Sequence, residues 1–524
     1  MGDNARVRKW VLQTLKFHGF SIRADAADYL TEQLLNLPQD SRISVLENLT
    51  DQLRMVNSDT LAVDKKQIEM CFRESLLEKP SSETVWNVID AFQCPRFIFN
   101  RELCKYEMDK SVMKKGLFAD ASSKSFMRRR LYTNIMQRTL RQDAIKQVFE
   151  VNGKKFQYVV KTVEWFLCAT DKIEHAVIIG LLVRKPDGGY AVEDTTGTLD
   201  IDISQTKFAD GLFPEHSFVF LEGIYEDRVF YVLRFGLPPA ETSMAARPYY
   251  DEMNTFGGPS QYNLKNSKVL KNIEEKNQDE MIVFISDVWL DNDKVLKQLD
   301  KLFSGFSEFP PYAFVLMGNF LSSQKVATYA QDLKQGFTEL GNIVVHYENI
   351  RNKSHFVFVP GPFDIGSPRI LPRPPLSKYL VSDFIAKVQN VTLATNPCRI
   401  QYCTREIVVI REDLVTKLCR NTIHFPNNAT DRISFHFVKT ILSQGTLAPM
   451  SLLVCPVYWN FSHALDLNPL PDLVVASDQF NSFTEKYMDC TVISPGLFVK
   501  EKFSFKVYVP FRNEVEDSCI PEEI

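Results

Sequence analysis

The feature that most constrains the fold is an alternation of apolar strands and helical stretches from residue 281 to about residue 513. "MIVFIS" precedes "NDKVLKQLDKLF", "YAFVLMGNF" precedes "SQKVATYAQDLKQGFTEL", and the later apolar runs are "HFVFVPGPFD", "EIVVIR", "DLVVASD" and "CTVISPG". Fully apolar strands that alternate with helices are typical of sheets covered on both faces, so 281–513 predicts a layered α/β domain. Ligand sites in such folds lie at the carboxyl ends of strands, and the polar side chains of this segment stand there.

The N-terminal part of the chain predicts helices. Its four amphipathic stretches are "ARVRKWVLQTLKFHGF", "ADAADYLTEQLLNLP", "SRISVLENLTDQL" and "DKKQIEMCFRESL". Val7, Trp10 and Val11 recur at helical spacing in the first stretch, and Pro38 ends the second. Together they predict a four-helix bundle over 1–76. Such a bundle is either a structural domain or a docking module that presents one face to a partner.

The segment 77–174 is less regular and predicts a basic linker with a helical part. Between Arg96 and Glu150 the chain has 13 Lys or Arg and 6 Asp or Glu. "KSFMRRRLYTNIMQRTLR" mixes cations with apolar residues, which favours an amphipathic helix packed on another element. Its cations form a solvated helix face, a phosphate-contact patch or a nuclear-import signal. The candidate phosphate-contact residues are Lys124, Arg128, Arg129, Arg130, Arg138 and Arg141.

Short strands are predicted between residues 175 and 240. The turn sequences "KPDGG" and "DTTG" separate them, and Gly180 and Gly223 lie inside strand-like runs. Five such strands are typical of a small Greek-key barrel, and their order resembles the OB-fold. The strands are rich in Asp and Glu, which disfavours an open nucleic-acid groove and favours a barrel that faces a protein partner. The Pro- and Gly-rich stretch 241–280 predicts a connector.

Composition excludes several classes of protein. The formal net charge of -4 at pH 7 is not that of a chain that binds polyanions by bulk charge. The 10 cysteines form no C-x-x-C pair, which argues against a zinc ribbon and fits reduced thiols inside a cell. No apolar run approaches the roughly 18 residues of a membrane span, so no membrane partner is expected.

The strand ends resemble those of the calcineurin-like metallophosphoesterase fold. The active pattern there is D-x-H, GD-x-x-D, GNH-[DE] and GH-x-H, whose carboxylates and imidazoles hold two metals that activate a water. The corresponding strand ends here read "SDVWLD", "MGNF", "PGPFD" and "ASDQF". The positions of this vestigial metal site are Asp287, Trp289, Asn319, Pro362, Phe363, Asp364 and Asp478.

Almost every metal ligand of that pattern is replaced. Trp289 stands in place of a histidine, Asn319 in place of an aspartate, and Pro362-Phe363 in place of Asn-His. We therefore expect no metal, no cofactor and no catalysis, so that the chain is not an enzyme. Asp287 is then expected to be a turn or cap residue that satisfies backbone donors.

An acidic barrel before a metal-stripped phosphoesterase fold resembles the B-subunit family of replicative DNA polymerases. "ISDVWLD", "VPGPFD", "LSQGTLAP" and "VISPGLF" are similar to landmarks of that family. The resemblance covers nearly all of residues 1–515, and the helical extension at 1–76 is similar to that of the epsilon branch. It implies a multidomain α+β chain with an AAA+ lid-like helical domain, an OB-like barrel and an inactive phosphoesterase α/β sandwich.

The resemblance implies a non-enzymatic scaffold of chromosomal DNA replication in the nucleus. The implied partners are the metal-binding C-terminal region of the catalytic subunit of DNA polymerase epsilon, the replicative helicase through GINS, and small histone-fold polymerase subunits. Contact with DNA is implied to be weak or indirect. The alternatives are an active metallophosphoesterase, and a single-strand DNA-binding accessory protein that uses the barrel and the basic patch. No Gly-rich P-loop is present, so the lid resemblance brings no ATPase.

Two local expectations remain open at this point. Trp289 either fills the former metal cleft as packed core or lies on the surface as an anchor for a partner. The stretch 514–524 is acidic and has little that could pack, which predicts an exposed and weakly ordered tail.

Overall fold

The computed structural model describes residues 2–17, 20–35, 42, 45–46, 49–50, 53, 62–76, 84–109, 111, 116–146, 148–151, 154–157, 159–323, 328–366, 368–426 and 432–521. The chain forms two compact units, Met1–Thr84 and Val85–Ile524, each of which is described by itself. No helix in the described ranges is long and apolar enough to cross a membrane.

The first unit is mainly helical. It contains α1 Gly2–Phe17, β1 Ser21–Ile22, α2 Ala24–Leu35, β2 Ala62–Val63 and α4 Lys65–Leu76. Asp64 and Gln67 exchange hydrogen bonds of 2.9 and 3.0 Å between side chain and backbone, a capping box that begins α4. The third helix predicted from the sequence, at 41–53, lies largely outside the described residues. The short parallel pair β1–β2 was not predicted.

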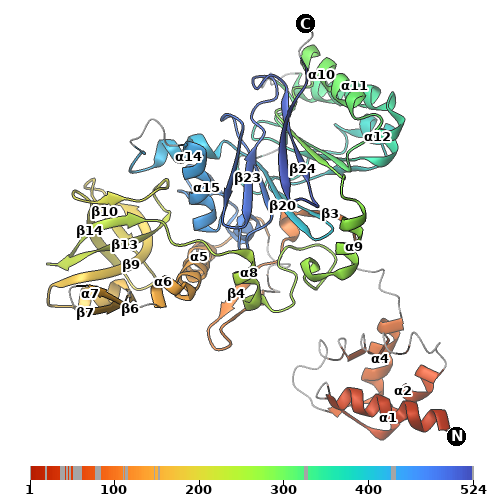
Figure 1. The fold of residues 1–524 in the computed structure, drawn as a ribbon, viewed down its shortest axis with the longest axis horizontal. Helices are drawn as coiled ribbons and strands as arrows, with labels where there is room; N and C mark the ends of the chain where they lie inside the picture. Colours follow the sequence, from red (N-terminus) through yellow and green to blue (C-terminus); the bar gives the residue numbers. More distant parts are fainter. Residues whose placement is uncertain are drawn as a thin grey trace. The chain divides into compact units, whose positions relative to one another are not determined.

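Five strands of the second unit close into a barrel (Figure 1). They are β9 Ile173–Arg184, β10 Tyr190–Glu193, β11 Thr198–Asp202, β13 Phe218–Glu226 and β14 Val229–Gly236. The order is β10-β11-β14-β13-β9, and β9 pairs again with β10. The short strands β8 Val160–Lys161 and β12 Lys207–Phe208 extend the sheet. The predicted five-stranded barrel is confirmed, and its core also includes α7, Val163–Cys168, which precedes residue 175.

The two glycines that the sequence placed inside barrel strands stand where no side chain fits. A Cβ at Gly180 would lie 2.4 Å from Cγ2 of Val192, and a Cβ at Gly223 would lie 2.1 Å from the carbonyl oxygen of Tyr231. Strands that curve this tightly approach one another closely only where one residue has no side chain.

Helix α5, Ala121–Arg141, is the amphipathic helix predicted in the basic segment. Tyr132 and Ile135 pack on the outside of the barrel against Ile179, and Arg130 forms an ion pair with Asp466 of the neighbouring sandwich. The helix therefore joins the two parts of the second unit. The other elements of the segment are β3 Trp86–Asp90, η1 Ala91–Gln93, β4 Phe97–Asn100, β5 Lys105–Met108, α6 Asp143–Lys146, β6 Val148–Val151 and β7 Lys154–Gln157.

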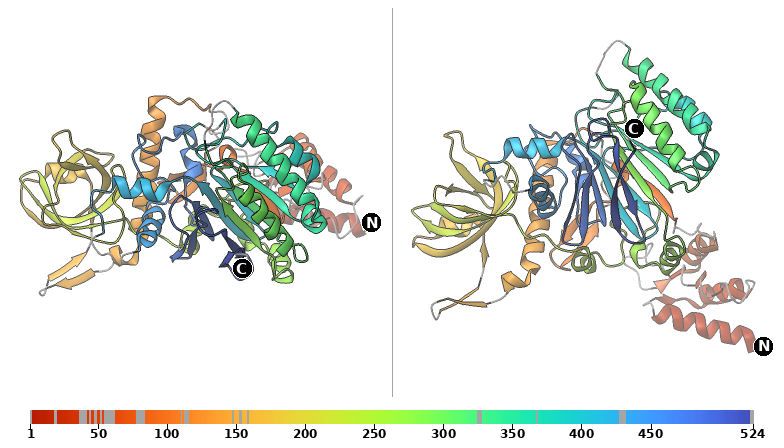
Figure 2. Two further views of the ribbon diagram at one scale, coloured as in Figure 1. Left: turned by 90° about the horizontal axis from the view of Figure 1, so that it is seen from above. Right: turned by 45° about the horizontal axis from the view of Figure 1, so that its top comes forward.

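Two six-stranded sheets form the sandwich (Figure 2). The first has the order β18-β17-β16-β15-β24-β25: Val391–Leu393, His355–Val359, Ala313–Met317, Ile282–Ser286, Ser504–Val509 and Glu514–Cys519. The second has the order β22-β23-β21-β20-β19-β3: Phe483–Tyr487, Cys490–Ser494, Leu473–Ser477, Arg405–Arg411, Cys398–Tyr402 and Trp86–Asp90. Strands β15 to β18 run parallel, as do β20, β21 and β23.

Helices cover the outer face of each sheet. Those on the first sheet are α10 Asp293–Gly305, α11 Tyr329–Val345, α12 Glu348–Lys353 and α13 Ser382–Lys387. Those on the second are α14 Leu414–Asn421, α15 Ile433–Gln444 and η5 Trp459–Leu465. A third core lies between the sheets, where Phe284, Val315 and Val475 are fully buried. The predicted layered α/β domain thus has four layers, and the predicted connector contains α8 Ser243–Ala246, η3 Arg247–Tyr250, η4 Leu264–Asn266 and α9 Lys268–Lys276.

Two sequence expectations differ from the structure. Strand β3 comes from the segment predicted as a linker, yet it pairs antiparallel with β19 at the edge of the second sheet. The acidic stretch 514–519 is not weakly ordered: it forms β25, antiparallel to β24, and most of its side chains remain exposed. Strand β3 was missed because its partner strand β19 is remote in sequence, and β25 was missed because its exposed, mostly polar residues carry no apolar period.

Candidate functional site

The carboxyl ends of the parallel strands lie along one edge of the sandwich, and polar residues from both sheets come together there. Asp287 follows β15 and Asn319 follows β16, while Arg411 ends β20 of the other sheet. Asn319 donates from Nδ2 to Oδ1 of Asp287 at 3.1 Å, and its backbone N–H donates to the same oxygen at 3.3 Å. Asp287 has a φ of 54°, a conformation that a residue without glycine's freedom keeps only when its surroundings hold it. This edge is the candidate functional site.

Arg411 lies directly beside Asp287 and holds both of its carboxylate oxygens. Its Nε lies 2.9 Å from Oδ2 of Asp287 and its Nη2 lies 3.0 Å from Oδ1. Nε also donates to the carbonyl oxygen of Gly318 at 3.0 Å, and Nη1 donates to Asp413 at 2.8 Å. The Arg411 side chain is fully buried. The guanidinium donates to both carboxylate oxygens of Asp287 and so places a positive charge beside that carboxylate.

Electrostatics keep this guanidinium charged. Burial alone would lower the pKa of Arg411, but the charges of Asp287 and Asp413 outweigh burial and raise that pKa above its usual value. Arg411 was not among the residues predicted from the sequence, where Asp287 was expected to be a turn or cap residue that satisfies backbone donors. The signal was present, since a cation follows the apolar run of "EIVVIR" at the carboxyl end of the strand, where ligand sites of such folds lie.

Asp364 is the second carboxylate that the structure brings to this edge. It accepts hydrogen bonds from the backbone N–H groups of Phe320 at 2.9 Å and Gly361 at 2.7 Å, and from the Tyr329 hydroxyl at 3.0 Å. Burial raises the pKa of Asp364 to about 6, the charge of Asp287 adds to that effect, and the three hydrogen bonds oppose it. Asp364 therefore organises the loops after β16 and β17.

The raised pKa of Asp364 predicts a pH dependence of stability. A carboxyl whose pKa is about 6 when folded binds its proton more tightly in the folded chain, so its contribution is present at low pH and is lost as pH rises through about 6. We expect the advantage of wild type over Asp364→Asn to fall by roughly 2–3 kcal/mol between about pH 4 and 6. Urea unfolding of both proteins across that range measures it. A constant difference would contradict the assignment.

Asp478 lies at the end of β21, where the pattern would place GH-x-H. It accepts hydrogen bonds from the N–H groups of Val415 at 2.8 Å and Phe480 at 2.9 Å, so it caps the start of α14. Burial raises the pKa of Asp478 to about 6, and the charge of Asp413 adds to the rise. Its role in the structure is to fix a helix.

The bulky residues at the positions predicted as a vestigial metal site are Trp289, Phe363 and Pro362. Trp289 is half-buried and packs against the core of the first sheet, and Phe363 is half-buried beneath the guanidinium of Arg369, 5.1 Å from its ring centroid. Pro362 is buried. Trp289 packs partly as the first alternative expects, but Arg411 and not an indole ring lies next to Asp287. The alternative that Trp289 anchors a partner stays a prediction. Within the described ranges, no group of three or more His, Cys, Asp or Glu is placed to hold a metal.

Three of the six candidate phosphate-contact residues turn inward on α5, so a single continuous patch does not form. Arg130 and Arg138 are buried, Arg130 pairs with Asp466, and Arg141 pairs with Glu241. These cations were counted as available because the helical pattern does not tell which polar residues face a second protein layer.

The remaining three candidate residues face solvent at least in part. Lys124 and Arg129 are exposed and Arg128 is half-buried. Lys124 lies over the ring of Trp459, with Nζ 5.8 Å from its centroid. Contact of these residues with phosphate stays a prediction.

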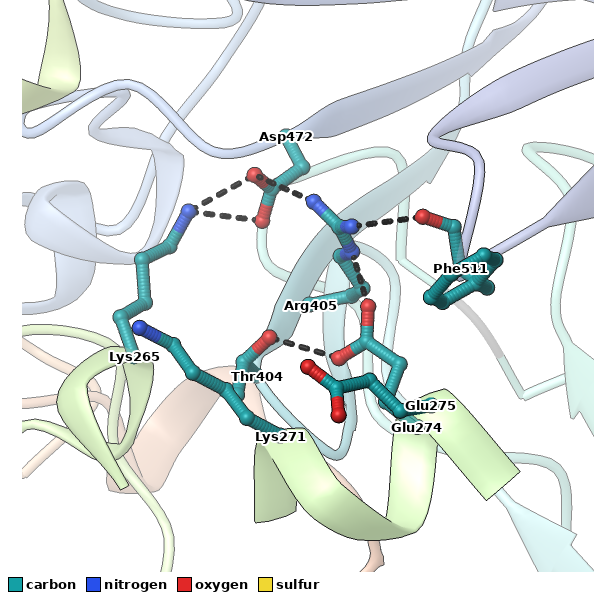
Figure 3. Close-up of a pocket in the computed structure, with 8 residues that line it drawn as sticks. All are labelled: Lys265, Lys271, Glu274, Glu275, Thr404, Arg405, Asp472 and Phe511. Atoms are coloured by element: carbon teal, nitrogen blue, oxygen red, sulfur yellow. Dashed lines mark hydrogen bonds and ion pairs between the residues drawn. The ribbon is translucent and has the colours of Figure 1, made fainter. Parts of the chain in front are cut away.

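A polar pocket of about 330 Å³ lies at the opposite edge of the sandwich, where β20 and β21 begin (Figure 3). Lys265 donates to both oxygens of Asp472 at 2.8 and 2.7 Å, and Arg405 donates to Glu274 at 2.7 Å. The pocket is lined by three cations and three carboxylates. Their charges balance and most of the groups pair with one another, so the pocket offers no unbalanced charge to a ligand.

Three family models match the chain. They are those of the DNA polymerase alpha/epsilon B subunit over residues 282–485, the OB-fold domain of DNA polymerase epsilon subunit 2-like proteins over 121–239, and DNA polymerases epsilon N terminal over 3–75. DNA polymerase epsilon subunit 2 of Bos taurus is 41% identical over 521 residues, which cover 98% of this chain and 98% of the relative. The chain belongs to the DNA polymerase epsilon subunit 2 family.

Other relatives carry the same name. DNA polymerase epsilon subunit 2 of Homo sapiens is 42% identical over 98% of both chains, and that of Drosophila melanogaster is 38% identical over 100% of this chain and 99% of the relative. As a member of the epsilon subunit 2 family the chain is an accessory B subunit, and that interpretation of the sequence is confirmed. A solved archaeal phosphodiesterase aligns with 46% of this chain and 99% of its own at 11% identity, but its TM-score of 0.26 is too low to carry an argument.

Proposed function

We propose that this chain is a non-catalytic scaffold of DNA polymerase epsilon, built on a phosphoesterase fold that no longer binds metal. The observation that carries the proposal is the buried ion pair between Arg411 and Asp287, whose two carboxylate oxygens are both engaged by the guanidinium. A metal at the same place would have to displace a tethered cation from a buried carboxylate. The missing histidines would leave that metal short of ligands.

The proposal predicts that the purified chain contains no stoichiometric Mn, Fe or Zn and does not hydrolyse phosphomonoesters or phosphodiesters. Trp289→His should create neither activity nor metal binding, because Arg411 and Asn319 still exclude the other ligands. Elemental analysis and a chromogenic phosphodiester assay provide the measurements. Two metals per chain, or turnover that disappears in Asp287→Asn, would show that the active phosphoesterase alternative is correct.

The scaffold role has two parts in this proposal. The barrel and the sandwich, joined by α5, hold the metal-binding C-terminal region of the catalytic subunit. The helical first unit, similar to the lid of AAA+ ATPases, links the polymerase to the replicative helicase through GINS in the nucleus. The small histone-fold polymerase subunits complete the assembly. That Met1–Thr84 forms a compact unit of its own supports a docking unit that acts independently.

A truncation experiment tests this division of roles. The fragment 1–84 should fold alone, with a helical circular dichroism spectrum, and should retain purified GINS. The fragment 85–524 should still co-purify with the catalytic subunit and lose GINS. The proposal is contradicted if 1–84 gives a random-coil spectrum, or if 85–524 no longer retains the catalytic subunit.

Weak DNA contact is a second candidate function, favoured by the outward cations of α5. Lys124 and Arg129 remain exposed, and Arg128 lies beside them on the helix. Three phosphate contacts would give a shallow salt dependence, so replacing all three with glutamine should lower the slope of log K against log salt by about 2–3. An unchanged slope would exclude these residues as phosphate contacts.

A further inference from the structure

The outer wall of the barrel carries a hollow of about 300 Å³ over β12, β13 and β14. Two rows of residues that cross these strands line it. Residues two apart on a strand, and register partners on neighbouring strands, lie on one face of a sheet. The first row is Lys207, Arg234 and Glu222, and the second is Ala209, Gly236 and Phe220.

The hollow exists because the middle of the second row has no side chain. A Cβ built at Gly236 would lie 3.8 Å from Cβ of Ala209 and 3.8 Å from the carbonyl oxygen of Phe220, which is ordinary contact. Gly236 does not have a left-handed backbone conformation. A larger residue would therefore fit there, so the fold does not require glycine at this position. The half-buried ring of Phe220 borders the open space.

Two cations stand side by side at the border of the hollow. Lys207 and Arg234 are register partners on neighbouring strands, and both are exposed. Like charges directly opposite each other destabilise a sheet. Glu222 compensates this only in part, because its carboxylate lies 3.8 Å from Nη1 of an Arg234 side chain that is 74% exposed. Among the described residues, no ion pair includes Lys207, so the border carries a net positive charge.

We propose that this hollow binds a short segment of a partner protein in which an apolar side chain stands next to one or two carboxylates. The apolar side chain packs over Gly236 against Phe220, and a carboxylate accepts hydrogen bonds from Lys207 and Arg234. That carboxylate also relieves the repulsion between the two cations. An arginine beside an apolar hollow is typical of the residues that contribute most to protein interfaces.

A single strand of nucleic acid fits this surface less well. Such strands bind along a continuous positive groove, because they carry a phosphate at every nucleotide. Here Glu222 interrupts the positive charge directly next to Arg234. A peptide, in contrast, needs a negative charge only where the two cations lie.

Fluorescence anisotropy with the full chain tests the proposal. The probe is a labelled, capped peptide in which leucine stands between two glutamates, with glycine and serine on either side. We expect saturable binding that weakens as salt is added. Replacing the leucine with alanine, or both glutamates with glutamine, should lower the affinity by roughly tenfold. The assay needs only the purified chain, so its outcome does not depend on the proposed role in DNA polymerase epsilon.

Two variants of the chain separate the charge from the hollow. Arg234→Ser should weaken the glutamate peptide by roughly three- to tenfold and leave the glutamine peptide unchanged, which a general structural defect would not do. Gly236→Val fills the hollow and should abolish saturable binding, while the melting temperature stays at or above that of wild type, because valine favours a strand over glycine. Arg512→Ser is the matched control, since Arg512 is an exposed arginine of the sandwich, and it should keep the wild-type affinity.

The proposal is overturned if the glutamate peptide does not bind saturably, if both peptides bind equally, or if Gly236→Val binds like wild type. A labelled oligothymidylate that binds wild type but not Arg234→Ser, with no binding of the peptide, would show a nucleic-acid surface instead. Should Gly236→Val fail to fold, Arg234→Ser and the pair of peptides decide.

Discussion

Replacing Arg411 with methionine is expected to lower the free energy of unfolding by about 3–5 kcal/mol. Methionine keeps much of the volume of the side chain but leaves Asp287 buried without its cation. Asp413 and the carbonyl of Gly318 lose their donors in the same variant. Urea unfolding at neutral pH, followed by circular dichroism, measures the change.

The matched control is Arg512→Met. Arg512 pairs with Glu516 in an exposed salt bridge at 3.0 Å, and such a pair contributes about 0–1 kcal/mol. Adding Asp287→Asn to Arg411→Met should recover part of the loss, because the unpaired buried charge is removed along with its partner. Equal costs for Arg411→Met and Arg512→Met would mean that the buried ion pair does not hold this edge together.

Gly318→Ala is expected to cost about 3 kcal/mol, although it adds a single methyl group. A Cβ at Gly318 would lie 2.0 Å from Oδ2 of Asp364 and 2.5 Å from the backbone nitrogen of Gly361. Neither group can move freely, since Asp364 also holds Phe320 and Gly361 itself belongs to the next strand end. Thermal unfolding of wild type and Gly318→Ala, followed by circular dichroism, measures the loss of stability.

Gly305→Ala serves as the comparison, because nothing lies within 4 Å of a Cβ built at Gly305, the last residue of α10. That variant should melt within a degree or two of wild type or slightly higher, as alanine favours a helix over glycine. If Gly318→Ala were equally harmless, the loops after β16 and β17 would have to be far more adaptable than their hydrogen bonds indicate.

The architecture could be predicted because its main signals are local. Apolar strands such as "MIVFIS", the turn sequences of the barrel and the glycines inside its strands each specify an element through neighbouring residues. These signals also placed Asp287, Asn319 and Asp364 at strand ends, where the structure brings them together. Strand β3 escaped prediction because its pairing with β19 joins residues more than 300 positions apart, as Asn87 and Gln401 do.

The content of the candidate site was harder to predict than its location. Arg411 reaches Asp287 across 124 positions of sequence and from the opposite sheet, so no local pattern joins them. The metallophosphoesterase pattern identifies which metal ligands are replaced, but it does not predict that an arginine lies beside Asp287. The arginines of α5 illustrate the same limit, because helical spacing groups Arg130 with Arg129 although one is buried and the other exposed.

The covalent attachment of the Arg411 guanidinium has a consequence for how the charge of Asp287 is balanced. A metal centre ties a fold to metal supply, since chelation or depletion empties it, and its ligands must shed protons before they bind. A covalently attached cation cannot diffuse away and stays charged across the physiological range. The charge that balances Asp287 is therefore present as soon as the chain folds, without a step in which a cation must first be bound.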